Sequence, residues 1–107
     1  MENNNLKFDF KDGTLRICII GEIEHHSAAK MRIEIDEKII ELCPKQVVLD
    51  LSQTDFIDSS GLGLVLGRYT RVQEIHGELV IANPSEHILQ ILKLAGVDQK
   101  IKIEYFG

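Results

Sequence analysis

The feature that most constrains the fold of this chain is a repeated change in its hydrophobic period. Residues 47–51 form a short, almost wholly apolar run rich in β-branched side chains, as in a strand buried on both faces. Residues 79–82 repeat that pattern, and residues 61–75 between the two runs carry apolar side chains at helical spacing. Strands that alternate with helices predict an α/β fold in which helices cover a mainly parallel sheet.

The first twenty residues show instead the two-residue period of half-buried strands. Residues 6–10 alternate between apolar and polar side chains, and an apolar face recurs over residues 14–20. Asp12-Gly13 between them is typical of a tight turn. We therefore expect an N-terminal β-hairpin, which makes the sheet mixed. Residues 101–105 also alternate and predict a last strand.

Three helices are predicted between these strands. Ser27 is the expected N-cap of the first, which runs to about Leu42 and stops before Pro44 because proline lacks a helical donor. Its inward face consists of Ala28, Met31, Ile35, Ile39 and Leu42. A second apolar stripe is either a flank of the core or a contact surface, and we expect a core flank; it comprises Ala29, Ile33 and Ile40. The third helix has Ser85 as its expected N-cap and Gly96 as its stop.

The second predicted helix, residues 61–75, ends before Gly77. Its inward face consists of Leu62, Val65, Leu66, Tyr69 and Val72. Leu64 points away from this face, so we expect it to be exposed. Gly63 and Gly67 lie together on one flank, and glycine costs about 0.5–1 kcal/mol in a helix interior. They indicate the close approach of another backbone, either from the same domain or from another protein.

Length, charge and composition together indicate which general class of protein this is. The chain has 107 residues and a net charge of −5, from 12 Lys+Arg against 17 Asp+Glu, so we expect one domain over residues 1–107. An acidic chain without a basic stripe is a poor ligand for nucleic acid. Its apolar runs are too short to span a bilayer and no secretory segment opens the chain. We therefore predict a cytoplasmic protein with no membrane segment.

The cysteines and histidines indicate neither a disulfide nor a metal site. Cys18 and Cys43 lie far apart, and we expect both to be small buried residues in a reducing compartment. The histidines lack the spacing of metal ligands such as HxxxH; they are His25, His26, His76 and His87. No metal is therefore predicted.

The unusual stretch is residues 55–69, between a buried strand and a helix. Its glycines do not form the GxGxxG dinucleotide motif, and the Gly-Lys-Ser/Thr of a phosphate-binding loop is absent. Ser59 and Ser60 lack the GxSxG of a nucleophile elbow, and nothing in the sequence places a histidine beside them. A nucleotide-binding or hydrolytic domain is therefore the weaker alternative.

A serine here is either a simple helix cap or a site that another enzyme modifies. The start of a helix carries about half a positive charge and several unpaired amide donors, so it can hold a phosphate. Phosphorylation would add about −1.5 to −2 charge next to Asp58 and near Asp55. Such a change would alter a docking surface without refolding the domain.

These residues resemble a known motif. Residues 58–63, Asp-Ser-Ser-Gly-Leu-Gly, continued by residues 66–69, resemble the phosphorylation-site motif of the STAS-domain anti-sigma factor antagonists. A second block with paired histidines, residues 21–28, is similar to a segment of the sporulation branch of that family. Residues 83–85 and 94–96 fall where the family has the exit of its fourth strand and its third helix. The resemblance covers essentially the whole chain.

The resemblance implies a regulatory protein rather than an enzyme. The family's phosphoacceptor is the serine directly after the aspartate, which is Ser59 here. The unphosphorylated protein binds an anti-sigma factor, a serine kinase that carries its own ATP, and releases the sigma factor. The kinase inactivates its antagonist by phosphorylating Ser59, and a PP2C-type phosphatase restores it. The resemblance implies no cofactor, a monomer when free, and partner contacts at Glu22, Glu24, His25, Asp58, Ser60, Gly61, Leu62 and Leu64.

Two departures from the family pattern matter. Glu24 stands where the family more often has aspartate, which puts the role of that carboxylate in question. The sequence stops at Gly107, where family members usually add a C-terminal helix. We therefore expect that the core edge under that helix is exposed or capped differently, or that the helix has been removed by truncation. The expected role is in sporulation, and the alternative is a general-stress or orphan antagonist of another sigma factor.

Overall fold

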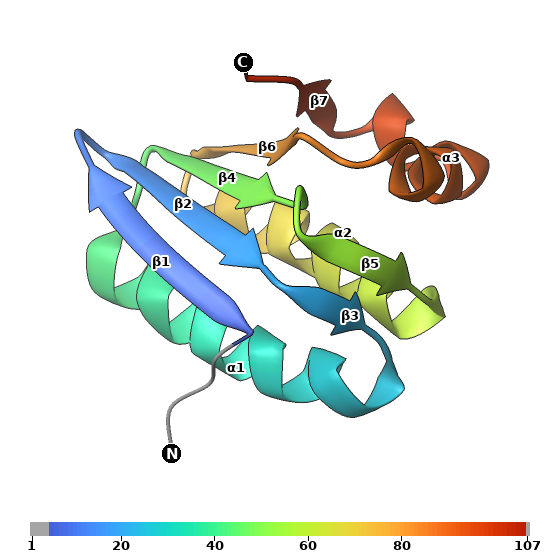
Figure 1. Ribbon diagram of the computed structural model, residues 1–107. Coiled ribbons are helices and arrows are strands. Elements are labelled where there is room, and N and C mark those ends of the chain that lie inside the picture. The colour runs from blue at the N-terminus through green and yellow to red at the C-terminus, as the bar shows by residue number, and fades with distance from the viewer. Residues whose placement is uncertain (1–4, 107) are drawn as a thin grey trace.

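The structure, a computed structural model, describes residues 5–106 and is organised around a five-stranded sheet (Figure 1). In spatial order its strands are β1 (Leu6–Lys11), β2 (Thr14–Ile19), β4 (Gln46–Asp50), β6 (Glu78–Ala82) and β7 (Lys102–Glu104). β1 and β2 form the predicted antiparallel hairpin, and β2, β4, β6 and β7 run parallel to one another. The expected mixed, mainly parallel sheet is confirmed.

A second, two-stranded sheet was not expected from the sequence. β3 (Gly21–Ile23) pairs in parallel with β5 (Thr54–Ile57). The two central residues of β5, Asp55 and Phe56, are both exposed, so this strand has no buried apolar run by which to recognise it. Each of the two strands leads directly into a helix, and their pairing brings the beginnings of those helices together.

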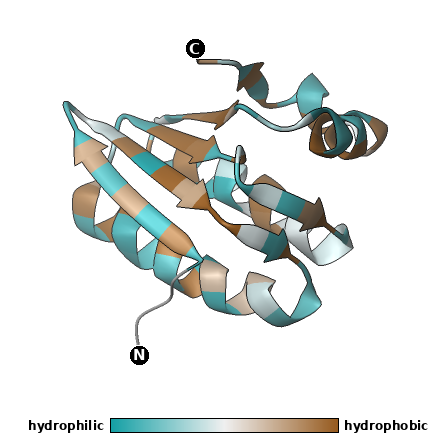
Figure 2. Cartoon of the chain, viewed as in Figure 1, coloured by the Kyte–Doolittle hydropathy of each residue, from teal (hydrophilic) through white to brown (hydrophobic). Residues whose placement is uncertain are grey.

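Helices α1 (His25–Leu42) and α2 (Ser59–Glu74) lie side by side and cover one face of the sheet (Figure 1). Helix α3 (Glu86–Leu94) and a short 3-10 helix (Val97–Gln99) lie beyond the end of β6. Hydrophobic and hydrophilic residues alternate along the hairpin strands (Figure 2), as expected for strands with one buried face. None of the helices described over residues 5–106 has both the length and the apolar character needed to cross a bilayer.

The predicted inward face of α1 is confirmed, whereas the prediction for its second stripe is wrong. Ala28, Met31, Ile35 and Ile39 are buried. Ile33 and Ile40 are 53% and 72% exposed, and Ala29 is exposed as well. At 100° per residue these three side chains point about 100–140° away from Ala28. That direction lies outside the arc of α1 that the sheet and α2 cover.

The expectation that both cysteines are buried is wrong for Cys43. Cys43 is exposed and takes a left-handed φ of 43° because the chain leaves α1 at this residue. Cys18 on β2 is half-buried, and burial raises the pKa of its thiol. Neither cysteine forms a disulfide.

The ends of α2 and α3 use different residues for their turns. His76, with φ of 61°, takes the left-handed conformation after α2, one residue before the predicted stop. Gly77 instead lies in a tightly packed place, because an added Cβ would lie 3.0 Å from Cγ1 of Val72 and 3.2 Å from the carbonyl oxygen of Lys45. Ser85 caps α3 as predicted, and Gly96 follows that helix with φ of 76°.

Candidate functional site

The predicted phosphoacceptor lies where two helices begin side by side. β3 and β5 are parallel neighbours with Ile23 opposite Ile57, and a helix cap directly follows each strand. α1 therefore begins at His25 and α2 at Ser59 on the same edge of the molecule. α2 starts two residues earlier than expected, and its cap is Asp58 rather than a serine.

Asp58 joins the two helix beginnings. Its Oδ1 accepts the backbone N–H of Gly61 at 3.0 Å, and its Oδ2 accepts that of His25 at 3.1 Å. Its own backbone N–H donates to the carbonyl of Ile23 at 3.2 Å. The N–H of Gly61, and after it that of His25, stabilises the ionised form and lowers the pKa of Asp58. The carboxylate is therefore charged and fixed in place at neutral pH.

Glu24, not Ser27, is the N-cap of α1, so the predicted cap is wrong. The Glu24 carboxylate accepts the backbone N–H groups of His26 and Ser27, both at 3.0 Å, and the bond from His26 contributes most to lowering the pKa of Glu24. The Ser27 hydroxyl in return accepts the N–H of Glu24 at 3.1 Å. Glutamate at this position therefore forms a complete capping box despite the departure from the family's aspartate.

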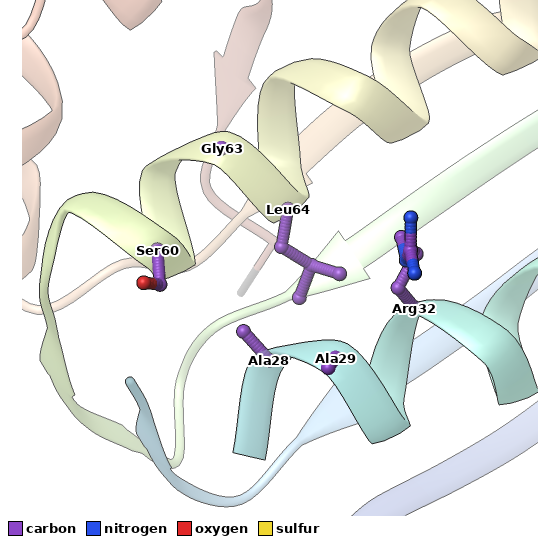
Figure 3. A pocket seen from close by; sticks show the side chains of 6 residues that line it. All are labelled: Ala28, Ala29, Arg32, Ser60, Gly63 and Leu64. Carbon is purple, nitrogen blue, oxygen red and sulfur yellow. The ribbon is translucent and has the colours of Figure 1, made fainter. Parts of the chain in front are cut away.

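The two serines of the motif differ in accessibility. Ser59 is exposed, whereas Ser60 is half-buried and lines a groove between α1 and α2 (Figure 3). The groove has a volume of about 210 Å³, and its other lining residues are Ala28, Ala29, Arg32, Gly63 and Leu64. An enzyme can therefore reach the hydroxyl of Ser59 more readily than that of Ser60.

Carboxylates accept four of the backbone N–H groups at this edge, so those amides are not free to hold a phosphate. Asp58 accepts from Gly61 and His25, and Glu24 accepts from the two amides that follow His25. Glu22 is also exposed on β3 nearby. A phosphate on Ser59 would therefore lie beside existing negative charge and would add about −1.5 to −2 elementary charges to it.

Three of the residues expected to contact a partner have packing roles. An added Cβ at Gly61 would lie 2.4 Å from the carbonyl oxygen of Ile23, so only glycine lets α2 approach β3 this closely. Leu62 is half-buried at the edge of the core. Leu64, expected to be exposed, is only 4% exposed because α1 packs against that side of α2 (Figure 3).

Packing inside the domain does not explain the other two glycines of α2. Within the described residues, a Cβ added at Gly63 or Gly67 would meet no atom within 4 Å outside the helix backbone and adjoining residues. The approach of a backbone from the same domain, one of the two predicted explanations, is therefore wrong. The approach of another protein's backbone stays a prediction.

Arg68 is a buried charge that the helical pattern did not place in the core. It is 6% exposed, and its Nε lies 3.1 Å from Oδ1 of Asp36 on α1, while Nη2 of Arg71 lies 3.7 Å from Oδ2 of Asp36. The short contact is not aligned as a hydrogen bond, and Nη1 of Arg68 is buried without a hydrogen-bond partner. Burial is the main cause that lowers the pKa of Arg68.

Two arrangements that enzymes use, a metal-ligating cluster and a serine hydrogen-bonded to a histidine, are absent from the described residues. Among residues 5–106, no cluster of three or more His, Cys, Asp or Glu side chains could hold a metal ion. In the same range neither Ser59 nor Ser60 shares a hydrogen bond with the ring of His25 or His26, and those two rings lie edge to face with centroids 5.3 Å apart.

Comparisons with known proteins place the chain in a family. A family model described as the STAS domain matches residues 5–105. The chain is 30% identical over 95 residues to the anti-sigma F factor antagonist of Paenibacillus polymyxa, covering 89% of this chain and 81% of that protein. It is 29% identical over 103 residues to the anti-sigma-B factor antagonist of Bacillus subtilis, covering 92% and 91%.

A solved structure shows the same fold. The anti-sigma factor antagonist SpoIIAA in its unphosphorylated form matches with a TM-score of 0.82 at 24% identity, over 95% of this chain and 88% of that one. The fold match, the domain match and the identity to the relative from Paenibacillus polymyxa agree with one another. The chain belongs to the anti-sigma factor antagonists of the STAS domain family.

Proposed function

We propose that this chain releases a sigma factor by binding its anti-sigma factor, and that phosphorylation of Ser59 switches this binding off. The observation that carries the proposal is the position of Ser59. It is exposed, it is the first residue of α2, and it directly follows the Asp58 carboxylate that links α2 to α1. The partner is a serine kinase that carries its own ATP, so the chain itself needs no cofactor.

The switch acts through charge at the docking edge rather than through unfolding. Asp58 and Glu24 hold both helix beginnings by hydrogen bonds that do not involve the Ser59 hydroxyl. A phosphate therefore leaves the caps intact and adds about −1.5 to −2 charge beside them. A partner surface that fits the unmodified edge would then meet a larger negative charge and a bulkier side chain.

The relatives suggest two candidate partners, which differ in the sigma factor that they regulate. The relative from Paenibacillus polymyxa is named for sigma F and the one from Bacillus subtilis for sigma B. The paired histidines His25 and His26 favour the sporulation branch, so we propose a sigma factor of sporulation. An antagonist of a general-stress sigma factor is the second candidate. A PP2C-type phosphatase completes the proposed cycle, and the free chain is proposed to be a monomer.

A phosphorylation assay tests the proposal. The purified chain is incubated with ATP and the anti-sigma F factor of its own organism, and the phosphate is mapped by mass spectrometry. We expect phosphate on Ser59, none in Ser59→Ala, and normal incorporation in the control Ser85→Ala. Unchanged incorporation in Ser59→Ala would overturn the assignment. A parallel reaction with the anti-sigma-B factor distinguishes the two candidate partners.

A further inference from the structure

The groove beside Ser60 continues as an open surface along α1 and α2. Ala29 and Gly63 line the groove from opposite helices. Ile33 lies one turn after Ala29 on the same side of α1, and Ile40 lies two turns further along. Gly67 leaves α2 equally open one turn after Gly63. We call this surface the α1–α2 seam; it consists of Ala29, Arg32, Ile33, Ile40, Gly63 and Gly67.

The residues of the seam are unfavourable for an isolated domain. Glycine in a helix interior costs about 0.5–1 kcal/mol relative to alanine. Neither Gly63 nor Gly67 has a positive φ or a close neighbouring atom that requires glycine. Ile33 and Ile40 are 53% and 72% exposed. A second polypeptide that covers the seam removes both disadvantages, because glycine admits a close backbone and the isoleucines become buried.

The centre of the seam is positively charged. Asp36 already pairs with Arg68 at 3.1 Å and with Arg71 at 3.7 Å. Arg32, one turn before Asp36, lines the groove, and within residues 5–106 no ion pair joins it to a carboxylate. Arg71 shares Asp36 with the buried Arg68, so this one carboxylate already serves two guanidinium groups and Arg32 adds a further positive charge at the groove. A ligand with a carboxylate fits this centre.

We propose that the α1–α2 seam is the docking surface for one amphipathic helix of the anti-sigma factor. Small and aliphatic side chains of that helix face Gly63 and Ile33, and an acidic side chain reaches Arg32. This inference rests on the proposed function, because it names the surface through which the same partner binds. The kinase then holds the chain along the seam while its active site reaches Ser59.

The charge of the seam disfavours a second copy of this chain as the occupant. In a two-fold arrangement the same patch meets itself, so each Arg32 would approach another set of arginines. Like charges brought together at an interface are unfavourable, whereas an acidic partner would neutralise them.

Two matched pairs of substitutions test the seam. Arg32→Glu is compared with Lys30→Glu, which makes the same charge change at an exposed position of α1 outside the seam. Ile33→Asp is compared with Leu94→Asp, which alters a side chain on α3 that is 90% exposed. In calorimetric titrations with the anti-sigma F factor, we expect the seam variants to bind about tenfold more weakly or worse, and the controls within about twofold of the unaltered chain.

The outcomes separate this inference from the proposed function. If the unaltered chain binds and both seam variants bind as tightly as it does, the seam proposal is wrong and the proposed function stands. The same conclusion follows if each control variant binds as weakly as its matched seam variant. If the unaltered chain binds neither the anti-sigma F factor nor the anti-sigma-B factor, both are overturned. If light scattering finds a dimer of the unaltered chain that Ile33→Asp dissociates, the occupant is a second copy and the seam proposal is wrong.

Discussion

Asp58 holds the backbone N–H of His25, a residue 33 positions earlier in the chain, through a hydrogen bond of 3.1 Å. The same carboxylate accepts the N–H of Gly61 at 3.0 Å. One side chain therefore caps α2 and fixes the beginning of α1, so the geometry around Ser59 depends on it.

Replacing Asp58 by alanine should destabilise the fold more than loss of an ordinary helix cap. The control is Ser85→Ala, which removes a cap that serves α3 alone and is expected to cost about 1 kcal/mol. Asp58→Ala should cost more, because amides of two helices lose their acceptor. Urea unfolding followed by circular dichroism measures both free energies. An equal or smaller loss for Asp58→Ala would show that the bond to His25 contributes nothing.

The stability of the protein should fall in acid because of the two capping carboxylates. The hydrogen bonds from Gly61 to Asp58 and from His26 to Glu24 lower both pKa values in the folded state. In the unfolded chain, the Asp and Glu carboxyl groups have pKa values of about 3.9 and about 4.3. The stabilisation is therefore complete above these values and is lost as the pH falls through the lower folded-state pKa values. Urea midpoints at pH 7, 4 and 3 measure the loss, and the Asp58→Asn/Glu24→Gln variant should show a flatter pH profile.

Two glycine-to-alanine substitutions in the same helix should have opposite effects. A Cβ at Gly61 would lie 2.4 Å from a backbone oxygen of Ile23, so Gly61→Ala should cost about 1–3 kcal/mol. A Cβ at Gly63 meets open space, so Gly63→Ala should stabilise the isolated chain by about 0.5–1 kcal/mol. Urea unfolding compares them directly. Effects of the same sign would contradict the packing described for the start of α2.

Removing Asp36 should be more damaging than removing Arg68. Asp36→Ala leaves the guanidinium of Arg68 buried without a counter-charge and should cost about 2–3 kcal/mol, less than for a fully buried pair because the Asp36 side chain is 17% exposed. Arg68→Met removes the buried charge and fills similar space, so its cost should be smaller. In a double-mutant cycle, Asp36→Ala should cost less in the Arg68→Met background than alone. Additive costs would show that the two residues do not interact.

A negative charge at Ser59 should weaken partner binding without weakening the fold. Ser59→Asp alters an exposed side chain, so the free energy of unfolding should change by about 0.5 kcal/mol or less. Binding of the anti-sigma factor should weaken, while Ser85→Asp, the same change at the first residue before α3, should bind normally. A large loss of stability in Ser59→Asp would instead assign Ser59 a structural role.

Features that depend on short-range periodicity were predictable from the sequence. The hairpin, the buried parallel strands and the inward face of α1 follow from alternation over a few residues, and the structure confirms them. The cap at Ser85 was recognisable because its acceptor and donor lie within one turn. Each of these features is determined by residues close together in the sequence, so the sequence alone is enough to predict it.

Features that depend on distant neighbours were not predictable in the same way. Leu64 and Arg68 are buried only because α1 lies against α2, and no periodicity within α2 shows where a second helix will pack. Strand β5 pairs with β3 although its central residues, Asp55 and Phe56, are exposed, so its own sequence does not mark it as a strand. At the site, the sequence indicated Ser59 and Asp58 as neighbours, but the bond from Asp58 to His25 required the fold.

The hydrogen bond between Asp58 and His25 also determines whether a folded chain or only a short peptide presents the complete surroundings of Ser59 to a kinase. A peptide of residues 55–64 contains the whole serine motif, yet it lacks the strand β3, the Glu24 carboxylate and the helix that Asp58 holds. In a growing chain the complete edge arises only after β5 has paired with β3 and α2 has formed. A kinase that recognises Ser59 together with these neighbours therefore acts on finished, folded molecules and passes over fragments and unfolded copies.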